Sequence, residues 1–499
     1  MIKNFTKTDK QFGIALLIGL AIRLIAIPFS RPDQADAVTR IFIAQTWMAN
    51  PEFISSGVWG PLHTYLIAAI LYVWDDAVYA PVFQNCLFSA AVAIPLYFFV
   101  KREWDEIAAL FVACLYLAYP VAIHYGLVAM TEIPYIFFIA LALLALSHAR
   151  SENGNWKHAL SAGLIITMAS ALRYEAWGLI PFLGLLLWKK WKELLIFFAA
   201  SSIFPVFWLI GSYLEYGDPF YSFTWSVDWN LNVSLGNEGL TAVDIINRLI
   251  YFPRALFFGL TPLAFLACAA GIILVLYHRK KQWVWLIPFV ALFLTYTLNA
   301  VNGKLTTQIR YSLNLAIFII PFAAEWFLRQ KDARRFLFSA IVVGSMLPLS
   351  YLHYIIPWPF DFPHPVPKQI SFLPQVEQST VRISEYQIQQ SEQYAGGLLL
   401  DFYDWSETYY IALMSRKNAA NIFIMPGEVN EPLDMNELNA FMKNNPTGII
   451  VLTQKPRFMQ IEPTANGDQL SITGYEKTLS VEDAGESEGW RFYRYTVDP

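Results

Sequence analysis

Residues 11–29, QFGIALLIGLAIRLIAIPF, form an apolar run in which Arg23 is the one charged side chain. A helix that crosses a bilayer needs about 20 mostly apolar residues, so this run is long enough to span. It leads into Arg31-Pro32-Asp33 and not into a small-residue cleavage site, which favours a membrane helix over a cleaved signal. We therefore expect the chain to enter the membrane here.

The rest of the chain has the same character. Of its 499 residues 56% are hydrophobic and 15% are charged, whereas soluble globular chains have about 25% charged residues. The net charge of −4 gives no basic field, so we expect no nucleic acid partner. Apolar runs predict eleven spanning helices, at 11–29, 79–100, 104–124, 131–148, 158–172, 175–188, 194–211, 253–277, 283–299, 311–328 and 336–356.

Loop charges orient these helices. Cytoplasmic loops are enriched in Lys and Arg. If Val58 to Trp74 does not cross the membrane, most Lys and Arg residues of the short loops fall on one side. That run is therefore interpreted as an interfacial or re-entrant helix. The prediction is a multi-pass protein of the cell (inner) membrane, with the N-terminus in the cytoplasm and the C-terminus outside.

The fold class expected is a polytopic α-helical membrane protein with a small C-terminal α/β extracytoplasmic domain. Residues 1–356 form the membrane module, with outer loops at 30–78 and 212–252, and 357–368 form a Pro-rich linker. Residues 369–499 return to a soluble composition and form the outer domain. Its strands are expected at 398–403, 421–425 and 448–453, and its helices at 405–416 and 435–443.

Acidic residues stand at the outer ends of two predicted helices. Asp33 and Asp36 follow the first helix, and Glu132 begins a later one after His124. Each carboxylate has a structural alternative as a helix cap. A carboxylate facing the outer leaflet also suits a general base or a metal ligand.

Two arginines stand at the same outer level. Arg173-Tyr174-Glu175 interrupts two apolar runs, and Arg310-Tyr311 opens the run 311–328. Arg173 and Glu175 are either a solvated pair or part of a site. Arg310 either reaches lipid head groups as an interfacial anchor or binds a phosphate with its planar guanidinium.

Taken in order, these residues resemble the GT-C superfamily of membrane glycosyltransferases. The superfamily includes protein O-mannosyltransferases, the lipid A aminoarabinose transferase and the catalytic subunit of oligosaccharyltransferase, and the resemblance covers about residues 11–330. The local matches are Asp36, Pro61-Leu62-His63, Thr131-Glu132-Ile133-Pro134, Leu172-Arg173-Tyr174-Glu175-Ala176-Trp177 and Arg310-Tyr311. The mannosyltransferase Asp-Glu pair is replaced by Asp36-Ala37, which leaves Asp33 as an alternative to Asp36.

The resemblance implies transfer of a sugar from a polyprenyl-phosphate donor to a lipid, glycan or protein acceptor at the outer face of the bilayer. It implies catalytic roles for Asp36, Asp33 and Glu132. No obligatory cofactor is expected, although a divalent cation such as Mg²⁺ or Mn²⁺ stays open. The implied donor-phosphate ligands are Arg310, Arg173 and Tyr311, and the implied substrate contacts are His63, His124, Tyr174 and Glu175.

A secondary transporter or a lipid-linked glycan flippase is the alternative function. Transporters are commonly built from internal repeats with binding sites near the bilayer midplane. No matching halves are found in the sequence, and the ionisable residues gather at outer helix ends, which favours the enzyme.

Overall fold

The structure is a computed structural model that describes residues 6–54, 56–234, 240–350, 373–394, 396–427, 432–464 and 467–497. It divides into two compact units. The first comprises Met1–Phe29, Ser56–His63 and Phe83–Leu373, and the second comprises Ser30–Ser55, Thr64–Val82 and Pro374–Pro499. The predicted linker 357–368 lies outside the described residues.

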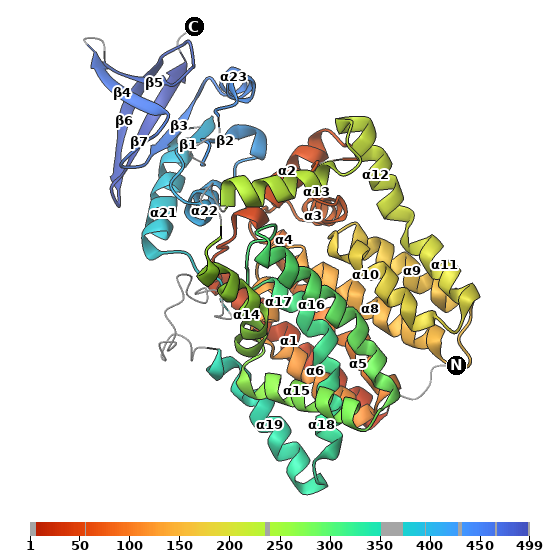
Figure 1. Cartoon of the computed structure of the whole chain (residues 1–499). Coiled ribbons are helices and arrows are strands. Elements are labelled where there is room, and N and C mark those ends of the chain that lie inside the picture. The colour runs from red at the N-terminus through yellow and green to blue at the C-terminus, as the bar shows by residue number, and fades with distance from the viewer. Residues whose placement is uncertain are drawn as a thin grey trace. The chain divides into compact units, whose positions relative to one another are not determined.

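The first unit is a bundle of helices (Figure 1). The helices from the N-terminus to the middle of the chain are α1 (Lys7–Ala26), α4 (Ala80–Ala91), α5 (Ala93–Glu103), α6 (Glu106–Leu117), α7 (Pro120–Gly126), α8 (Glu132–Arg150), α9 (Trp156–Ser170), α10 (Glu175–Gly184), α11 (Trp191–Ser201) and α12 (Ile203–Tyr216). They are followed by α13 (Tyr221–Asp228), α14 (Ala242–Gly259), α15 (Pro262–Tyr277), α16 (Leu286–Val301), α17 (Tyr311–Ile319), α18 (Ala323–Arg329) and α19 (Asp332–Leu349).

The protein is a multi-pass membrane protein, but the predicted count of about eleven spans is not confirmed. Among the described residues, six helical segments are long and apolar enough to cross a membrane, or eight if each of two bent pairs forms one span. The pairs α6–α7 and α14–α15 bend by 56° and 111°. Pro120 and Pro262 begin the second helix of each pair, and a proline there cannot donate the backbone bond that would continue the first helix.

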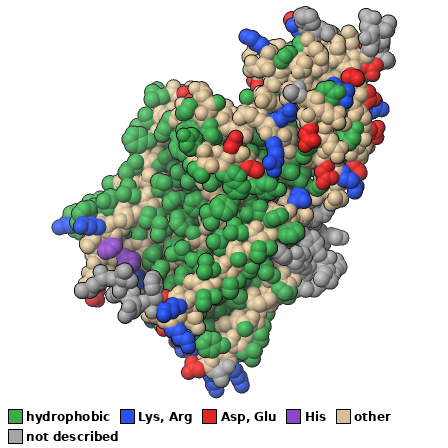
Figure 2. All heavy atoms as spheres, turned by 180° about the vertical axis from the view of Figure 1, so that it is seen from behind, with side chains coloured by type: hydrophobic (Ala, Val, Ile, Leu, Met, Phe, Trp, Pro, Cys, Tyr) green, Lys and Arg blue, Asp and Glu red, His purple; other side chains and the backbone are tan. Residues whose placement is uncertain are grey.

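The surface of the helical unit is suited to lipid. Figure 2 shows hydrophobic side chains that form a broad continuous face over this part of the molecule. Exposed hydrophobic side chains of this unit include Leu17 at 66% and Leu214 at 77%. A soluble protein rarely leaves so large an apolar face in water, so the bilayer is its natural solvent.

The second unit contains two helices from the first predicted outer loop, α2 (Ala35–Ala49) and most of α3 (Leu62–Val73). At 1.5 Å per residue, the 12 residues of α3 extend about 18 Å, which is short of the roughly 30 Å hydrocarbon core. This length agrees with the interpretation of that run as a helix that does not span.

The C-terminal part of the second unit is a seven-stranded mixed sheet with the order β2-β1-β3-β7-β6-β5-β4. β1 (Gly397–Leu400) pairs in parallel with β2 (Ile422–Ile424) and with β3 (Thr447–Leu452). The remaining pairs are antiparallel. They involve β4 (Met459–Thr464), β5 (Gly467–Ile472), β6 (Leu479–Ser487) and β7 (Trp490–Val497).

Helices α21 (Gln378–Gln393), α22 (Trp405–Met414) and α23 (Met435–Asn444) complete this sheet domain. Leu398 and Leu400 of β1 enter one buried apolar cluster with Ile411 of α22. Leu399, which points to the opposite face as strand geometry requires, enters a second cluster with Leu438 of α23. The predicted C-terminal α/β arrangement is therefore confirmed for β1 to β3 with α22 and α23. The antiparallel strands β4 to β7 are not among the predicted elements.

The predicted orientation is open to a labelling test. A cysteine introduced at Gln378 is expected to react with an impermeant maleimide in intact cells, and one at Lys281 is expected to react only after lysis. Both positions are exposed, whereas the native cysteines are buried or half-buried and give a low background. Reaction of position 281, but not 378, in intact cells would invert the topology.

Candidate functional site

Four charged side chains predicted separately from the sequence meet in the first unit. Glu132 is the first residue of α8 and is fully buried. Arg173 lies in the turn between α9 and α10 and forms ion pairs with Glu132 and with Glu175, the first residue of α10. Arg310, which immediately precedes α17, places its Nε 3.4 Å from Oε1 of Glu132. We call these four residues the buried charge cluster.

The two arginines are held differently. Arg173 donates from Nε and Nη2 to Oε1 of Glu175, at 3.1 and 2.6 Å, and from Nη1 to Glu132 and to Thr131 Oγ1. Its guanidinium is thus fixed by two carboxylates. Arg310 contacts Glu132 through its Nε, at the longer distance of 3.4 Å.

Aromatic and amide groups extend the cluster into the bundle. Tyr296 of α16 donates a hydrogen bond of 3.1 Å to Oε1 of Glu175, and Asn314 of α17 donates one of 2.8 Å to the Tyr296 hydroxyl. The ring of Tyr311 lies 5.5 Å from the guanidinium carbon of Arg173 and 5.6 Å from that of Arg310. Tyr296 and Asn314 were not among the predicted site residues, although a tyrosine and an asparagine in apolar runs are a usable signal.

Three helix N-termini converge at the cluster, since α8, α10 and α17 begin at Glu132, Glu175 and Tyr311. The helix dipole is positive at a helix start, so such ends attract anions. The two arginines add two positive charges and the two glutamates cancel them. An anion can therefore bind at the cluster if it displaces one of the carboxylates from its arginine.

The segment Gly60-Pro61-Leu62 packs against the turn that carries Arg173. Leu62 donates its backbone N–H to the Ala171 carbonyl at 3.1 Å, and the Tyr174 hydroxyl donates to the Val58 carbonyl at 2.8 Å. A Cβ on Gly60 would lie 2.4 Å from the Ala171 oxygen, so this approach requires glycine. Two motifs that are far apart in the sequence are thus in direct contact.

The remaining predicted residues are in several places. His63 and His124 are buried in the first unit, with 3% and 1% of their surfaces exposed. Asp33 and Asp36 belong to the second unit, where Asp36 lies in the first turn of α2 and the Asp33 carbonyl accepts a 2.9 Å bond from Ser406 Oγ. In the part of the chain that the structure describes, no three His, Cys, Asp or Glu side chains are grouped to hold a metal.

The short helix α7, which leads to Glu132, is held by four polar side chains of α1 and α4. These are Arg23, Asn85, Cys86 and Ser89, which we call the polar seam. The seam donates to backbone carbonyls around both ends of α7, at Leu117, Ala122, Tyr125, Gly126 and Val128. A broken helix in a membrane needs such partners because lipid offers none.

Arg23 is the charged member of the polar seam. It is fully buried and donates to Ser89 Oγ at 2.8 Å, to the Gly19 carbonyl at 2.9 Å and to the Leu117 carbonyl at 3.1 Å. The Leu117 carbonyl ends α6, where the helix dipole is negative and favours a cation.

Replacing Arg23 with methionine is expected to lower the stability of the protein by about 1–3 kcal/mol, because it removes the buried hydrogen bonds to Ser89 and to the Leu117 carbonyl. Thermal unfolding in detergent, followed by size-exclusion chromatography, measures this loss. Arg102→Met is the matched control, since Arg102 is exposed at the end of α5. Equal unfolding temperatures for Arg23→Met and the unmodified protein would contradict the structural role of the seam.

Comparisons with known proteins address the fold. Residues 58–210 match the family described as dolichyl-phosphate-mannose-protein mannosyltransferase. The crystal structure of ArnT from Cupriavidus metallidurans bound to undecaprenyl phosphate aligns with a TM-score of 0.66 and 10% identity, covering 96% of this chain and 97% of ArnT. The chain has the GT-C fold.

A second GT-C structure agrees. The oligosaccharyltransferase of Archaeoglobus fulgidus, in complex with Zn and sulfate, aligns with a TM-score of 0.55 and 14% identity, and the alignment covers 89% of this chain and 68% of that one. No curated protein matches by sequence. The fold implied by the resemblance to the GT-C superfamily is thus confirmed.

Proposed function

We propose that the protein is a membrane glycosyltransferase that transfers a sugar from a polyprenyl-phosphate donor to an acceptor at the extracytoplasmic face of the cell membrane. The observation that carries the proposal is the buried charge cluster, where two arginines and three helix N-termini converge. The alignment with ArnT bound to undecaprenyl phosphate supports the choice of donor.

In this proposal Arg310 binds the donor phosphate and Tyr311 lines the same place. Arg310 is preferred to Arg173 because Arg173 is already fixed by Glu132 and Glu175. Glu132 contacts both guanidinium groups. In this proposal it orients them and neutralises their charge while no donor is bound. His63, His124, Tyr174 and Glu175 remain proposed substrate or supporting contacts.

The proposed reaction is a displacement at the anomeric carbon. The acceptor hydroxyl oxygen forms a bond to that carbon, the bond from the carbon to the phosphate oxygen breaks, and the hydroxyl proton passes to a carboxylate, for which Asp36 is the first choice and Asp33 the second. The polyprenyl phosphate departs with the electron pair. A fixed cation that meets this developing charge lowers the barrier.

The test uses the purified protein in lipid nanodiscs with radiolabelled polyprenyl-phosphate sugars and an extract of envelope lipids and glycans as acceptors. Release of free polyprenyl phosphate together with label in an acceptor is the expected result. Intact donor after incubation, with movement of labelled donor between leaflets in vesicles, would favour the flippase instead.

A metal requirement is tested in the same assay. Because a monophosphate donor can be bound by arginines alone, we expect activity to persist when EDTA is added. Carboxylate oxygens are also the ligands that Mg²⁺ prefers, so the cation is worth a direct test. Loss of transfer in EDTA that is restored by Mn²⁺ or Mg²⁺ would establish a metal-dependent enzyme.

A further inference from the structure

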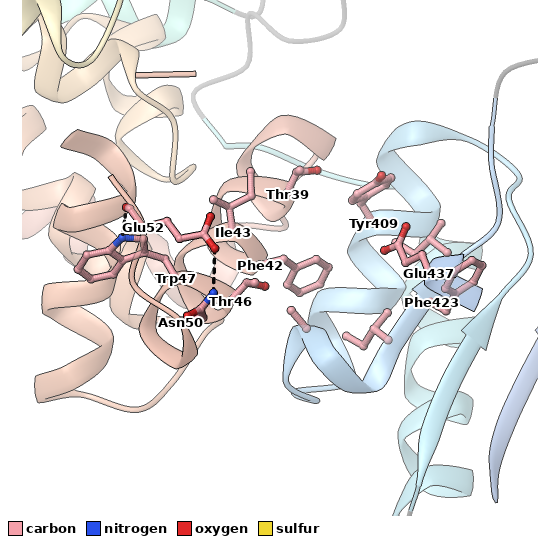
Figure 3. A pocket seen from close by; sticks show the side chains of 13 residues that line it. Thr39, Phe42, Ile43, Thr46, Trp47, Asn50, Glu52, Tyr409, Phe423 and Glu437 are labelled. Atoms are coloured by element: carbon pink, nitrogen blue, oxygen red, sulfur yellow. Dashed lines mark hydrogen bonds between the residues drawn. The ribbon is translucent and has the colours of Figure 1, made fainter. Parts of the chain in front are cut away.

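A pocket of about 410 Å³ lies within the second unit (Figure 3). One wall comes from α2 and the residues after it, and the other from α22, β2 and α23. The two walls are joined by direct contacts, since Phe42 packs on the apolar cluster of the sheet domain and the Gln45 side chain accepts a 3.0 Å bond from the Ala419 backbone. Small-molecule sites in proteins have volumes of about 300–1,000 Å³, so the pocket is large enough for a ligand.

The pocket has an aromatic platform that is fixed before any ligand binds. The Trp47 indole Nε1 donates a 2.8 Å hydrogen bond to the Glu52 carbonyl, and the Trp47 ring lies 5.0 Å from that of Tyr65. Both contacts restrict the rotation of the indole. Phe42 and Tyr409 add further ring surface to the lining. A prearranged aromatic surface reduces the entropy that binding must overcome.

The polar groups of the pocket are hydrogen-bonding amides, hydroxyls and carboxylates. Asn50 donates from Nδ2 to Glu52 Oε1 at 2.8 Å, and Figure 3 shows this pair beside Trp47. Thr46 and Glu437 also line the pocket. Its lining includes two glutamates and, among the described residues, neither Lys nor Arg. A phosphate or an acidic sugar is therefore repelled, whereas a hydroxyl-rich ligand finds both donors and acceptors.

We propose that this pocket binds a sugar unit without acidic groups, which belongs to the acceptor. A sugar ring combines an apolar C–H face, which suits the Trp47 indole, with a rim of hydroxyl groups, which suits Asn50 and Glu52. The assignment of this sugar to the acceptor rests on the proposed function, but the binding itself does not. The donor phosphate is assigned to the buried charge cluster, which belongs to the other unit.

The test is isothermal titration of the full-length protein in nanodiscs with three trisaccharides: chitotriose, mannotriose and trigalacturonate. At least one of the two neutral sugars is expected to bind, and trigalacturonate is expected to bind at least about tenfold more weakly. Trp47→Ala is expected to weaken the neutral sugar about tenfold, which is the effect of losing about 1.4 kcal/mol of contact. Asn50→Ala, at an exposed position, is expected to act in the same direction without disturbing the fold.

Tyr403→Ala is the matched control, because Tyr403 is an aromatic residue of the same unit, is 61% exposed and does not line the pocket. Binding of no neutral trisaccharide at millimolar concentration would overturn the inference, as would equal binding by the unmodified protein and both pocket variants. Release of polyprenyl phosphate is measured in parallel. If no neutral trisaccharide binds but polyprenyl phosphate is still released, this inference alone is refuted. If a neutral trisaccharide binds but no polyprenyl phosphate is released, the proposed function alone is refuted.

Discussion

Replacing Arg310 with lysine is expected to reduce sugar transfer about tenfold or more, and replacing it with alanine about 10²–10³-fold, while the protein still folds and inserts. Arg310 is 9% exposed and precedes the first turn of α17, where its guanidinium meets Glu132 and the ring of Tyr311. Lysine keeps the charge but not the planar pair of donors that a phosphate accepts from arginine. An arginine that only anchors the chain at lipid head groups would tolerate lysine.

The measurement is the initial rate of polyprenyl-phosphate release as a function of donor concentration. Arg248→Lys is the matched control, since Arg248 is a half-buried arginine of α14 that donates to the Ala300 and Leu305 carbonyls outside the buried charge cluster. If Arg310→Lys has the donor saturation and turnover of the unmodified enzyme, the phosphate role passes to Arg173.

Asp36→Asn is expected to lower turnover by about 10²–10⁴-fold with little change in donor affinity, because a positioned base contributes rate and not donor binding. Asp36 lies in the first turn of α2, where the loss of its charge costs the helix about 0.3–1 kcal/mol. Single-turnover transfer, measured next to a thermal unfolding curve, separates the two effects.

Asp33→Asn is the comparison, since it removes a neighbouring carboxylate that precedes α2. Activity retained in Asp36→Asn and lost in Asp33→Asn would move the proposed base to Asp33. Activity retained in both variants would refute the proposed carboxylate mechanism.

Much of the fold could be predicted because apolar length is a local property. Residues 11–29 and 131–148 each predict one helix, and α1 and α8 are present there. The breaks are harder to predict, because Thr261 must adopt a positive φ of 68° for the 111° turn between α14 and α15. β7 was missed although Trp490, Phe492 and Tyr493 are buried along it, since short alternating strands give a weak signal.

The members of the buried charge cluster could be proposed from sequence, but their pairing could not. Glu132 and Arg173 are 41 residues apart and meet because α8 packs against α9. That contact depends on tertiary packing, which no local pattern encodes. Tyr296 and Asn314 are polar residues in apolar runs, which marks them as candidates, but their place in the cluster follows only from hydrogen bonds that the sequence does not show.

The polar seam can form only after the first helix has already been inserted into the membrane. Arg23 emerges from the ribosome within the first span, long before Ser89 and Leu117, its partners in the finished bundle. Until then an arginine at the centre of a membrane helix costs about 2.5–3.5 kcal/mol on the scale of helix insertion. The most apolar 18-residue window of Lys7–Phe29 has a mean hydropathy of 2.3, the highest among the six unbroken candidate spans of the described residues, which offsets that cost. The first helix must therefore be more apolar than its final packing requires, so that it stays in the membrane until α4 and α6 are inserted.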